Sequence, residues 1–327
     1  MQKKSMKFRT EIDIKAWQQP IGYDDCIMSL GSCFATNIAS KLSERHFKVT
    51  SAPTGILFNP ASIARALDLM TSGCTVAADS LIMVNDRYVH FDFHSSVSGA
   101  TADEAVGVMN EALRRGGEAL QRADMLIVTL GTAWVYRHVD SGAVVANCHK
   151  VPARMFRREL LSVEECVELL EHIVELAPRR LLFTVSPVRH VGEGLEDNAL
   201  SKSLLRVAVD VVCRRHAHRV SYFPAYEILI DDLRDYRFYC EDMVHPTPQA
   251  VEYVAQKFFD AALSGEARGV MHRVEQIVAA SRHRPTNPAS EQHRTFCRRQ
   301  LEAINSIPGV DLSEERAIFE QMLQINL

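Results

Sequence analysis

The chain has 327 residues, of which 47% are hydrophobic and 24% are charged, a composition typical of a soluble globular protein with one large α/β domain plus an extension or with two smaller domains. The formal net charge of −4 gives no basic field, so we expect neither nucleic acid nor an anionic membrane as a partner. No segment has the eighteen or so consecutive apolar residues of a membrane span. Residues 1–17 are basic but lack the apolar core of a secretory signal, so we expect a cytoplasmic location.

Four short apolar runs, each bounded by helical patterns, predict parallel strands. Runs that are apolar on both faces suit strands covered by helices on both sides. Apolar residues recur at helical spacing over 35–42, 169–176 and 251–262, between or after these runs. The runs are CIMSLG (26–31), MLIVTLGT (125–132), RLLFTVSPV (180–188) and, more weakly, RVSYFPAYEIL (219–229). The sequence therefore predicts repeated βαβ units.

Two segments alternate apolar and polar residues and predict β-hairpins. Residues 81–99 turn at Asn85-Asp86, and residues 134–150 turn at Asp140-Ser141-Gly142. The second hairpin leaves the carboxyl end of the 125–132 strand, where ligands bind in open α/β sheets. We therefore expect it to form one wall of a site.

Near residue 266 the composition becomes polar and proline-bearing. Two amphipathic helices are expected to follow, one through Phe296, Leu301 and Ile304 and one after DLSEE. We expect a catalytic domain at 1–265 and a C-terminal helical extension at 266–327.

The eight cysteines contain no C-x-x-C pair, so free thiols are expected rather than disulfides or a zinc knuckle. His90, His94, Cys148 and His149 show no recognised ligand spacing. We expect neither a bound metal nor a cofactor.

The stretch EDMVHPT places an acid three residues before a histidine in a loop. Pro246 disfavours helical geometry at His245, so the imidazole belongs to the loop that precedes a helix. Asp242 can reach one ring nitrogen and fix the tautomer while the other serves a nucleophile. The competing interpretation is a surface loop with a helix-capping acid.

The stretch IMSLGSCFATNIASKL reads as a buried strand, Gly31, then Ser32 and Cys33 at the start of a helix. Free N–H groups at a helix N-terminus can hold an oxyanion, and the helix dipole lowers a thiol pKa. Either side chain could be the nucleophile.

These features resemble the GSCFA family of the SGNH (GDSL-type) hydrolase clan. SLGSCFA is the motif that names the family, and further motifs follow in the family's order: GILFNPASI, LGTAWVY, NCHKVP, TVSPVRH, SKSLLR, YFPAYEI, DYRFY and DMVHPT. The resemblance implies a flavodoxin-like three-layer α/β/α sandwich with a parallel sheet. The two hairpins would then be insertions and the C-terminal helices an appendage.

The resemblance also implies roles for individual residues. Asp242 and His245 match the clan's D-x-x-H block. The LGTAW strand end corresponds to the clan's G-x-N-D block, with Gly131 at the glycine. Ala133 stands where the clan usually has an oxyanion-hole asparagine, and losing such a donor can cost about 2.7–4 kcal/mol. Candidates to replace it are the side chains of Asn59 and Asn147 and the backbone N–H of Gly55. A turn residue before Pro60 is an equally good interpretation of Asn59.

Laying the G-D-S pattern of the clan on this chain places Cys33 at the nucleophilic serine and Ser32 at the aspartate. A shift of one residue in the turn would reverse the two roles, so Ser32 stays the second choice. Cys148-His149 and Arg189-His190 are expected to line the substrate pocket, with Arg189 suited to an anionic group. Ordinary loop hydrogen bonding is the alternative for these four residues.

Two hypotheses for function follow. The first is an esterase or O-acyltransferase that forms an acyl-enzyme on Cys33 or Ser32 and acts on a small-molecule or glycan ester, with an acyl-CoA as a conceivable donor. The second is a catalytically retired binding module for a glycan or small metabolite, because a fold alone does not prove activity.

Overall fold

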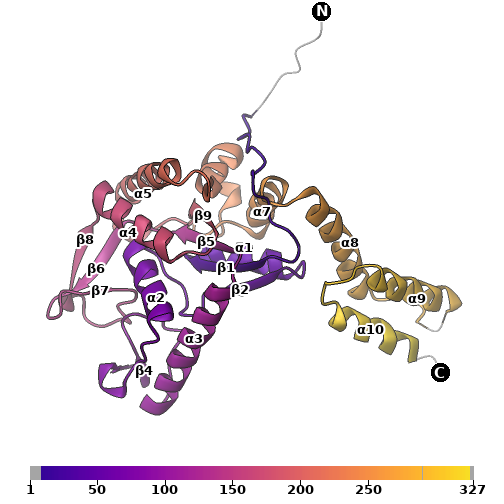
Figure 1. The fold of residues 1–327 in the computed structure, drawn as a ribbon, viewed down its shortest axis with the longest axis horizontal. Coiled ribbons are helices and arrows are strands. Elements are labelled where there is room, and N and C mark those ends of the chain that lie inside the picture. The colour runs from indigo at the N-terminus through magenta and orange to yellow at the C-terminus, as the bar shows by residue number, and fades with distance from the viewer. Residues whose placement is uncertain (1–8, 289, 325–327) are drawn as a thin grey trace, which may run out of the picture. The chain divides into compact units, whose positions relative to one another are not determined.

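The computed structural model describes residues 9–288 and 290–324, and a five-stranded sheet forms the centre of its larger unit (Figure 1). The strands are β1 (Cys26–Gly31), β2 (Lys48–Ser51), β5 (Met125–Leu130), β9 (Arg180–Val185) and β10 (Val220–Phe223). Their order in the sheet is β2-β1-β5-β9-β10, and the pairs β1–β5, β5–β9 and β9–β10 are parallel. This order is that of a doubly wound, flavodoxin-like sheet.

Helices cover the sheet and give a three-layer α/β/α arrangement, as the family resemblance implied. They are α1 (Cys33–Ser43), α2 (Pro60–Ser72), α3 (Ala102–Arg122), α4 (Val163–Leu176), α5 (Leu195–Arg215) and α7 (Pro248–Ala262). Within one layer α2 packs on α3 and α4, and α4 packs on α5. The main hydrophobic core includes Leu30, Val128 and Phe183, none of which is exposed to solvent. All six residues of β5 are buried, which explains its uninterrupted apolar sequence.

The first predicted hairpin is present but shorter than the sequence indicated. Strands β3 (Ile82–Val84) and β4 (Arg87–Val89) pair antiparallel, and Asn85 and Asp86 have φ of 49° and 58°. Two positive φ values in succession are typical of a two-residue type I′ turn. The apolar–polar alternation continues to Phe93, but the N–H of Phe93 donates to the His90 carbonyl and forms a turn there instead.

The second hairpin is confirmed and gains a third strand. Strands β6 (Trp134–His138) and β7 (Val144–Val145) pair antiparallel, and β8 (Phe156–Leu160) pairs with the other edge of β6. Figure 1 shows this small sheet at the left of the view, beyond the carboxyl end of β5.

The smaller unit of the chain includes Lys15–Asp25, Ser40–Lys48 and the residues from Gln256 onward. It contains α8 (Gly265–Ser281), α9 (Glu291–Asn305) and α10 (Ser313–Gln324), packed on a cluster that includes Ile277, Cys297 and Phe319. The helices α9 and α10 are the two that the sequence predicted, whereas α8 was not predicted.

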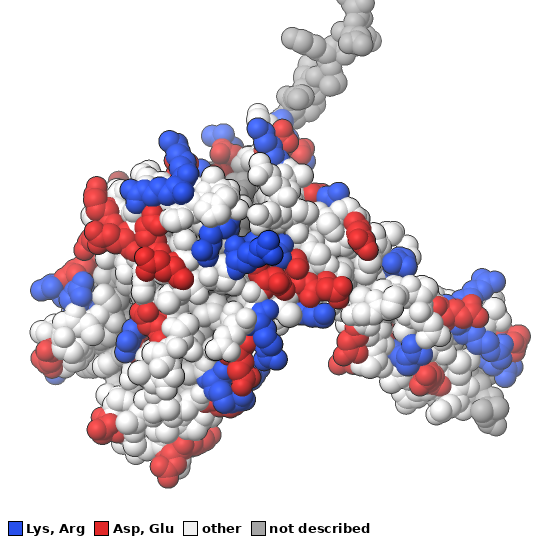
Figure 2. Space-filling view, viewed as in Figure 1, with Lys and Arg blue, Asp and Glu red and all other residues white. Residues whose placement is uncertain are grey.

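Several short helical segments complete the described chain. They are Ala78–Ser80, Ala153–Met155, Val191–Glu193, α6 (Ala225–Glu227), a π-helical turn at Ile228–Leu233, and Tyr236–Phe238. Within residues 9–288 and 290–324 no helix combines the length and the hydropathy needed to cross a membrane. Figure 2 shows acidic and basic side chains on the same face with wide uncharged areas between them, so neither sign dominates that face.

Candidate active site

The candidate site lies where β1, β5 and β9 end. Between β1 and β5 the strand order reverses, which is where ligands bind in doubly wound sheets. Gly31, the last residue of β1, has φ of 128°, and a Cβ there would lie 2.1 Å from the Thr129 carbonyl oxygen. Only glycine fits this close approach to β5, so the sharp turn into α1 depends on it.

Ser32 is a helix-capping residue in this turn. Its N–H donates to the Thr129 carbonyl at 3.0 Å, and its Oγ accepts the N–H of Phe34 at 3.3 Å. Ser32 is only 1% exposed, whereas Cys33, the first residue of α1, is half-buried. Of the two predicted nucleophiles, Cys33 is therefore the more accessible.

The pKa of the Cys33 thiol departs from the sequence-based prediction. Burial raises this pKa, and it outweighs the opposing effects of the backbone N–H groups of Cys33 and Phe34 and of the Lys202 charge. The prediction that the helix N-terminus lowers the thiol pKa was thus wrong in its net direction, because the prediction left desolvation out. At neutral pH Cys33 is a thiol that needs a base.

Asp242 and His245 form the pair that the sequence predicted. His245 Nδ1 donates to Asp242 Oδ2 at 2.7 Å, while Oδ1 accepts the N–H groups of Val244 and His245 at 2.8 and 3.0 Å. The Asp242 pKa is lowered to about 2. The main causes are hydrogen bonds from the backbone N–H and the ring of His245, followed by the hydrogen bond from the Val244 N–H. The carboxylate therefore fixes Nδ1 as the protonated nitrogen and leaves Nε2 as a proton acceptor.

The loop that holds this pair is itself well bonded. Cys240 N–H donates to the His245 carbonyl at 2.8 Å, and Tyr239 and Pro246 form an antiparallel bridge. Within the described chain no hydrogen bond joins the His245 ring to Ser32 or Cys33. Bonds between a catalytic base and its nucleophile are often long in the free enzyme and tighten only when substrate binds.

Electrostatic effects on pKa link four side chains of the site, those of Cys33, His190, Lys202 and His245. The Lys202 charge influences the pKa of Cys33, and both Lys202 and His245 influence the pKa of His190. Burial, followed by these two charges, lowers the His190 pKa to about 4, so its imidazole is neutral at physiological pH.

Lys202 is a feature of the site that sequence reasoning missed. Lys202 belongs to α5, and its side chain is completely buried. Its Nζ donates to the carbonyls of Gly131 at 2.6 Å and Ser186 at 2.8 Å. Burial lowers the pKa of Lys202 to about 7. Lys202 thereby ties the end of β5 to the end of β9.

The neighbouring Ser201 fixes the start of the second hairpin. Its Oγ accepts the N–H of Ala133 at 2.7 Å and pairs with Thr132 Oγ1 at 3.0 Å. The SKSLLR motif was visible in the sequence, but nothing in it showed that a helical lysine and serine would turn inward.

A cavity of about 240 Å³ opens beside this cluster, lined by Phe58, Asn59, Thr132, Trp134, Tyr136, Val145, Ala146, Asn147, Cys148 and His190. Asn59 caps α2 through Oδ1, which accepts the Ser62 N–H at 2.8 Å, and Asn147 Oδ1 accepts the His149 N–H at 2.8 Å. Neither amide nitrogen has a hydrogen-bond partner among the described residues. His190 Nε2 is also buried without a partner. The two interpretations of Asn59 are therefore compatible, since it caps a helix and keeps a free donor.

Comparison with protein families decides where the chain belongs. The model of the GSCFA family matches residues 26–258, and a model described as the C-terminal domain of GSCFA domain proteins matches residues 274–325. The chain belongs to the GSCFA family. A search of curated proteins finds no match.

Three residues that were expected to bind substrate in this GSCFA protein use their hydrogen-bonding groups within the fold instead. The Gly55 N–H donates to the Ala52 carbonyl at 2.8 Å, and the Gly131 N–H donates to the Phe58 carbonyl at 2.7 Å. The ring nitrogens of His149 are bonded to Ser95 Oγ and the His90 carbonyl. The free N–H expected at Gly55 is thus absent, because a tight backbone turn uses it, and His149 holds two loops together.

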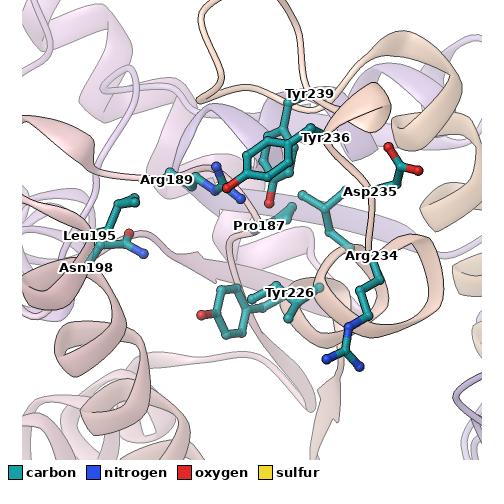
Figure 3. A pocket seen from close by; sticks show the side chains of 11 residues that line it. Pro187, Arg189, Leu195, Asn198, Tyr226, Arg234, Asp235, Tyr236 and Tyr239 are labelled. Carbon is teal, nitrogen blue, oxygen red and sulfur yellow. The ribbon is translucent and has the colours of Figure 1, made fainter.

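A second cavity of about 310 Å³ in the GSCFA domain contains Arg189, the other predicted pocket residue (Figure 3). Pro187, Asn198, Tyr226, Tyr236 and Tyr239 also line it. In the described part of the chain no group of three or more His, Cys, Asp or Glu side chains comes together in a way that could hold a metal ion.

Proposed function

We propose that this GSCFA protein transfers or hydrolyses acyl esters through an acyl-enzyme on Cys33, with His245 as the base and Asp242 as the residue that orients it. The Asp242–His245 bond of 2.7 Å, in the loop that precedes α7, is the observation that carries the proposal. It also favours a place in the SGNH clan, whose acid and base come from such a block. The burial of Ser32 supports Cys33 over Ser32.

In the proposed first half-reaction, the Cys33 thiol passes its proton to His245 Nε2 while its sulfur attacks. The attacked atom is the carbonyl carbon of the ester or of the acyl-CoA, and the tetrahedral intermediate collapses as the leaving alkoxide, or the CoA thiolate, takes the proton from His245. In the second half, water or an acceptor hydroxyl gives its proton to His245 and attacks the thioester. The intermediate then releases Cys33, which regains the proton. Because burial raises the thiol pKa, the base has to act during attack.

The oxyanion of each intermediate needs hydrogen-bond donors. They have to replace the asparagine that the clan usually has at the position of Ala133. The amide nitrogens of Asn59 and Asn147 line the same cavity as His190, whose neutral ring has an unpartnered Nε2. With the proton on Nε2, His190 is a hydrogen-bond donor that carries no charge of its own. We propose these three groups as the oxyanion and substrate donors.

The proposed substrate is a small-molecule or glycan ester. A thioester intermediate exchanges readily with hydroxyl acceptors, which favours transfer over hydrolysis, and an acyl-CoA is a chemically suitable donor. The test is incubation with p-nitrophenyl esters and acyl-CoA donors, followed by mass spectrometry of the peptides. The expected result is an acyl adduct on Cys33. An adduct on a peptide that lacks residues 32 and 33 would contradict the proposal.

The second candidate is a binding module without activity, and two observations favour it. The N–H groups of Gly55 and Gly131 are used internally, and the Cys33 pKa is raised rather than lowered. Alkylation by iodoacetamide at increasing pH distinguishes the two functions. In an enzyme, the alkylation rate of one thiol, Cys33, should fall when His245 is replaced. In a binding module, alkylation should be slow and should not change when His245 is replaced.

A further inference from the structure

The cavity that contains Arg189 lies next to the proposed catalytic loop. The loop after β9, the start of α5, the π-helical turn at Ile228–Leu233 and the segment at 235–239 form its walls. The Arg189 N–H donates to the Val244 carbonyl at 3.2 Å, and the His190 N–H donates to Asn198 Oδ1 at 3.0 Å. The cavity is thus linked to the Asp242–His245 loop by a backbone hydrogen bond and to His190 through the Asn198 side chain.

Arg189 has no carboxylate partner in the described chain. Its guanidinium lies 3.9 Å from the ring centroid of Tyr239 and 5.2 Å from that of Tyr236, and its Nη1 donates to the Met243 carbonyl at 3.4 Å. Figure 3 shows the guanidinium beside the two rings, with the Asp235 carboxylate pointing away from it. Asp235 instead accepts the N–H of Arg237 at 2.9 Å. A guanidinium held in place by rings, with N–H donors left over, is suited to an oxyanion.

The exposed lining of the same cavity combines apolar side chains with the charged Arg234 and Asp235. Tyr236, Leu195 and Ile230 line it and are 63%, 56% and 38% exposed, respectively. Large apolar side chains grouped at the mouth of a cavity, around a few polar groups, are typical of a ligand site. A flat or aliphatic part of a ligand could cover them.

We propose that this cavity binds the anionic group of a substrate whose adjoining part is flat or apolar, with Arg189 as the anion-binding residue. The inference rests on the proposed function in one respect, that this molecule is the acyl donor or acceptor of Cys33. The anion is a phosphate or a carboxylate, since both offer the paired oxygens that a guanidinium binds. Tyr236 contributes a face on which the adjoining part packs.

The test is isothermal titration calorimetry on the full chain with adenosine 3′,5′-bisphosphate, hexanoate and uncharged adenosine. Arg189→Gln removes the cation and keeps the size of much of the side chain. Arg237→Gln is the matched control, because Arg237 also stacks on an aromatic ring, Phe238 at 5.0 Å, but does not line this cavity. Losing a hydrogen-bonded charge should weaken binding about tenfold to a hundredfold.

The expected result is that at least one anionic probe binds the wild type and Arg237→Gln alike, and binds Arg189→Gln at least about tenfold more weakly. The stronger of the two anionic probes identifies phosphate or carboxylate, and adenosine should bind more weakly than its bisphosphate. Equal affinity for Arg189→Gln and wild type, or no binding of either anionic probe to the wild type, would overturn the inference.

The binding measurement does not depend on chemistry at Cys33. A Cys33→Ser protein should bind the same probe as the wild type does. If no acyl adduct forms but Arg189-dependent binding persists, the proposed function fails and the anion site stands. If adducts form but binding is independent of Arg189, the anion site alone fails.

Discussion

At the scale of single residues, the turn after β1 gives neighbouring side chains different tasks. Ser32 Oγ accepts the Phe34 N–H, whereas Cys33 is half-buried and the Lys202 charge influences the pKa of its thiol. A hydroxyl committed to capping a helix would have to break that bond before it attacked a substrate. The difference leads to a test with two substitutions.

Cys33→Ser should leave a folded protein with a large loss of single-turnover acylation, whereas Ser32→Ala should be milder. The shorter C–O bond displaces the attacking atom, and a hydroxyl has a pKa far above that of a thiol. The Ser32 substitution removes a helix cap, which typically costs about 1 kcal/mol of stability. Stopped-flow acylation, with circular dichroism as the control for folding, gives the comparison. A Cys33→Ser protein that acylates at the wild-type rate would rule out this nucleophile.

His245→Ala should reduce acylation more than Asp242→Asn does. His245→Ala removes the proposed base itself, whereas in Asp242→Asn the base remains and the asparagine can still accept a hydrogen bond from its ring. Values of kcat/KM for one p-nitrophenyl ester should show this order, with thermal unfolding as the control. Equal losses in two proteins of native stability would mean that the aspartate does more than orient the ring.

At the scale of secondary-structure elements, α2 depends on the same residue that offers an amide to the cavity. Asn59→Asp should keep the cap of α2, since aspartate and asparagine are about equally good there, but it removes the amide donor. Asn59→Ala should lose both and destabilise the protein by about 1 kcal/mol. Urea unfolding and acylation rates, measured on both proteins, separate the two roles. Full activity of Asn59→Asp would show that the amide is not an oxyanion donor.

Strands and hairpins were predictable wherever a local pattern determined them. Four of the five strands of the main sheet were found because helices cover both faces and leave continuous apolar runs. The fifth, β2 at Lys48–Ser51, was missed because its KVTS sequence is polar and partly exposed at the sheet edge. The hairpin turn at Asn85-Asp86 was found from residue types that tolerate positive φ.

The candidate site was predictable only in part, because tertiary packing decides what a polar side chain does. The contact between Asp242 and His245 follows from their spacing in a loop. The burial of Lys202 does not, since lysine in a helix normally faces solvent and only the packing of α5 turns it inward. His149 looked like a pocket residue for the opposite reason, because the sequence does not show that both of its ring nitrogens are engaged.

At the scale of the whole molecule, the buried lysine couples folding to pH. The unfolded chain should hold the Lys202 proton up to about pH 10.5, whereas burial lowers the pKa in the folded protein to about 7. Between these values the unfolded state binds more protons than the folded state, so the free energy of unfolding should rise with pH across this window. Below pH 7 and above pH 10.5 this residue makes no contribution to the pH dependence.

Lys202→Met should remove that rise. Because methionine does not titrate, the free energy of unfolding of the wild type relative to the variant should increase by a few kcal/mol between about pH 7 and pH 10.5. Urea unfolding at several pH values gives the difference, and Lys150→Met, at an exposed lysine, is the control that should show no such trend. The variant also leaves the carbonyls of Gly131 and Ser186 without the Nζ donor, which lowers stability by the same amount at every pH and does not alter the slope. A difference that stays constant across this pH range would mean that Lys202 keeps its proton in the folded protein, and that its charge is present beside Cys33 throughout.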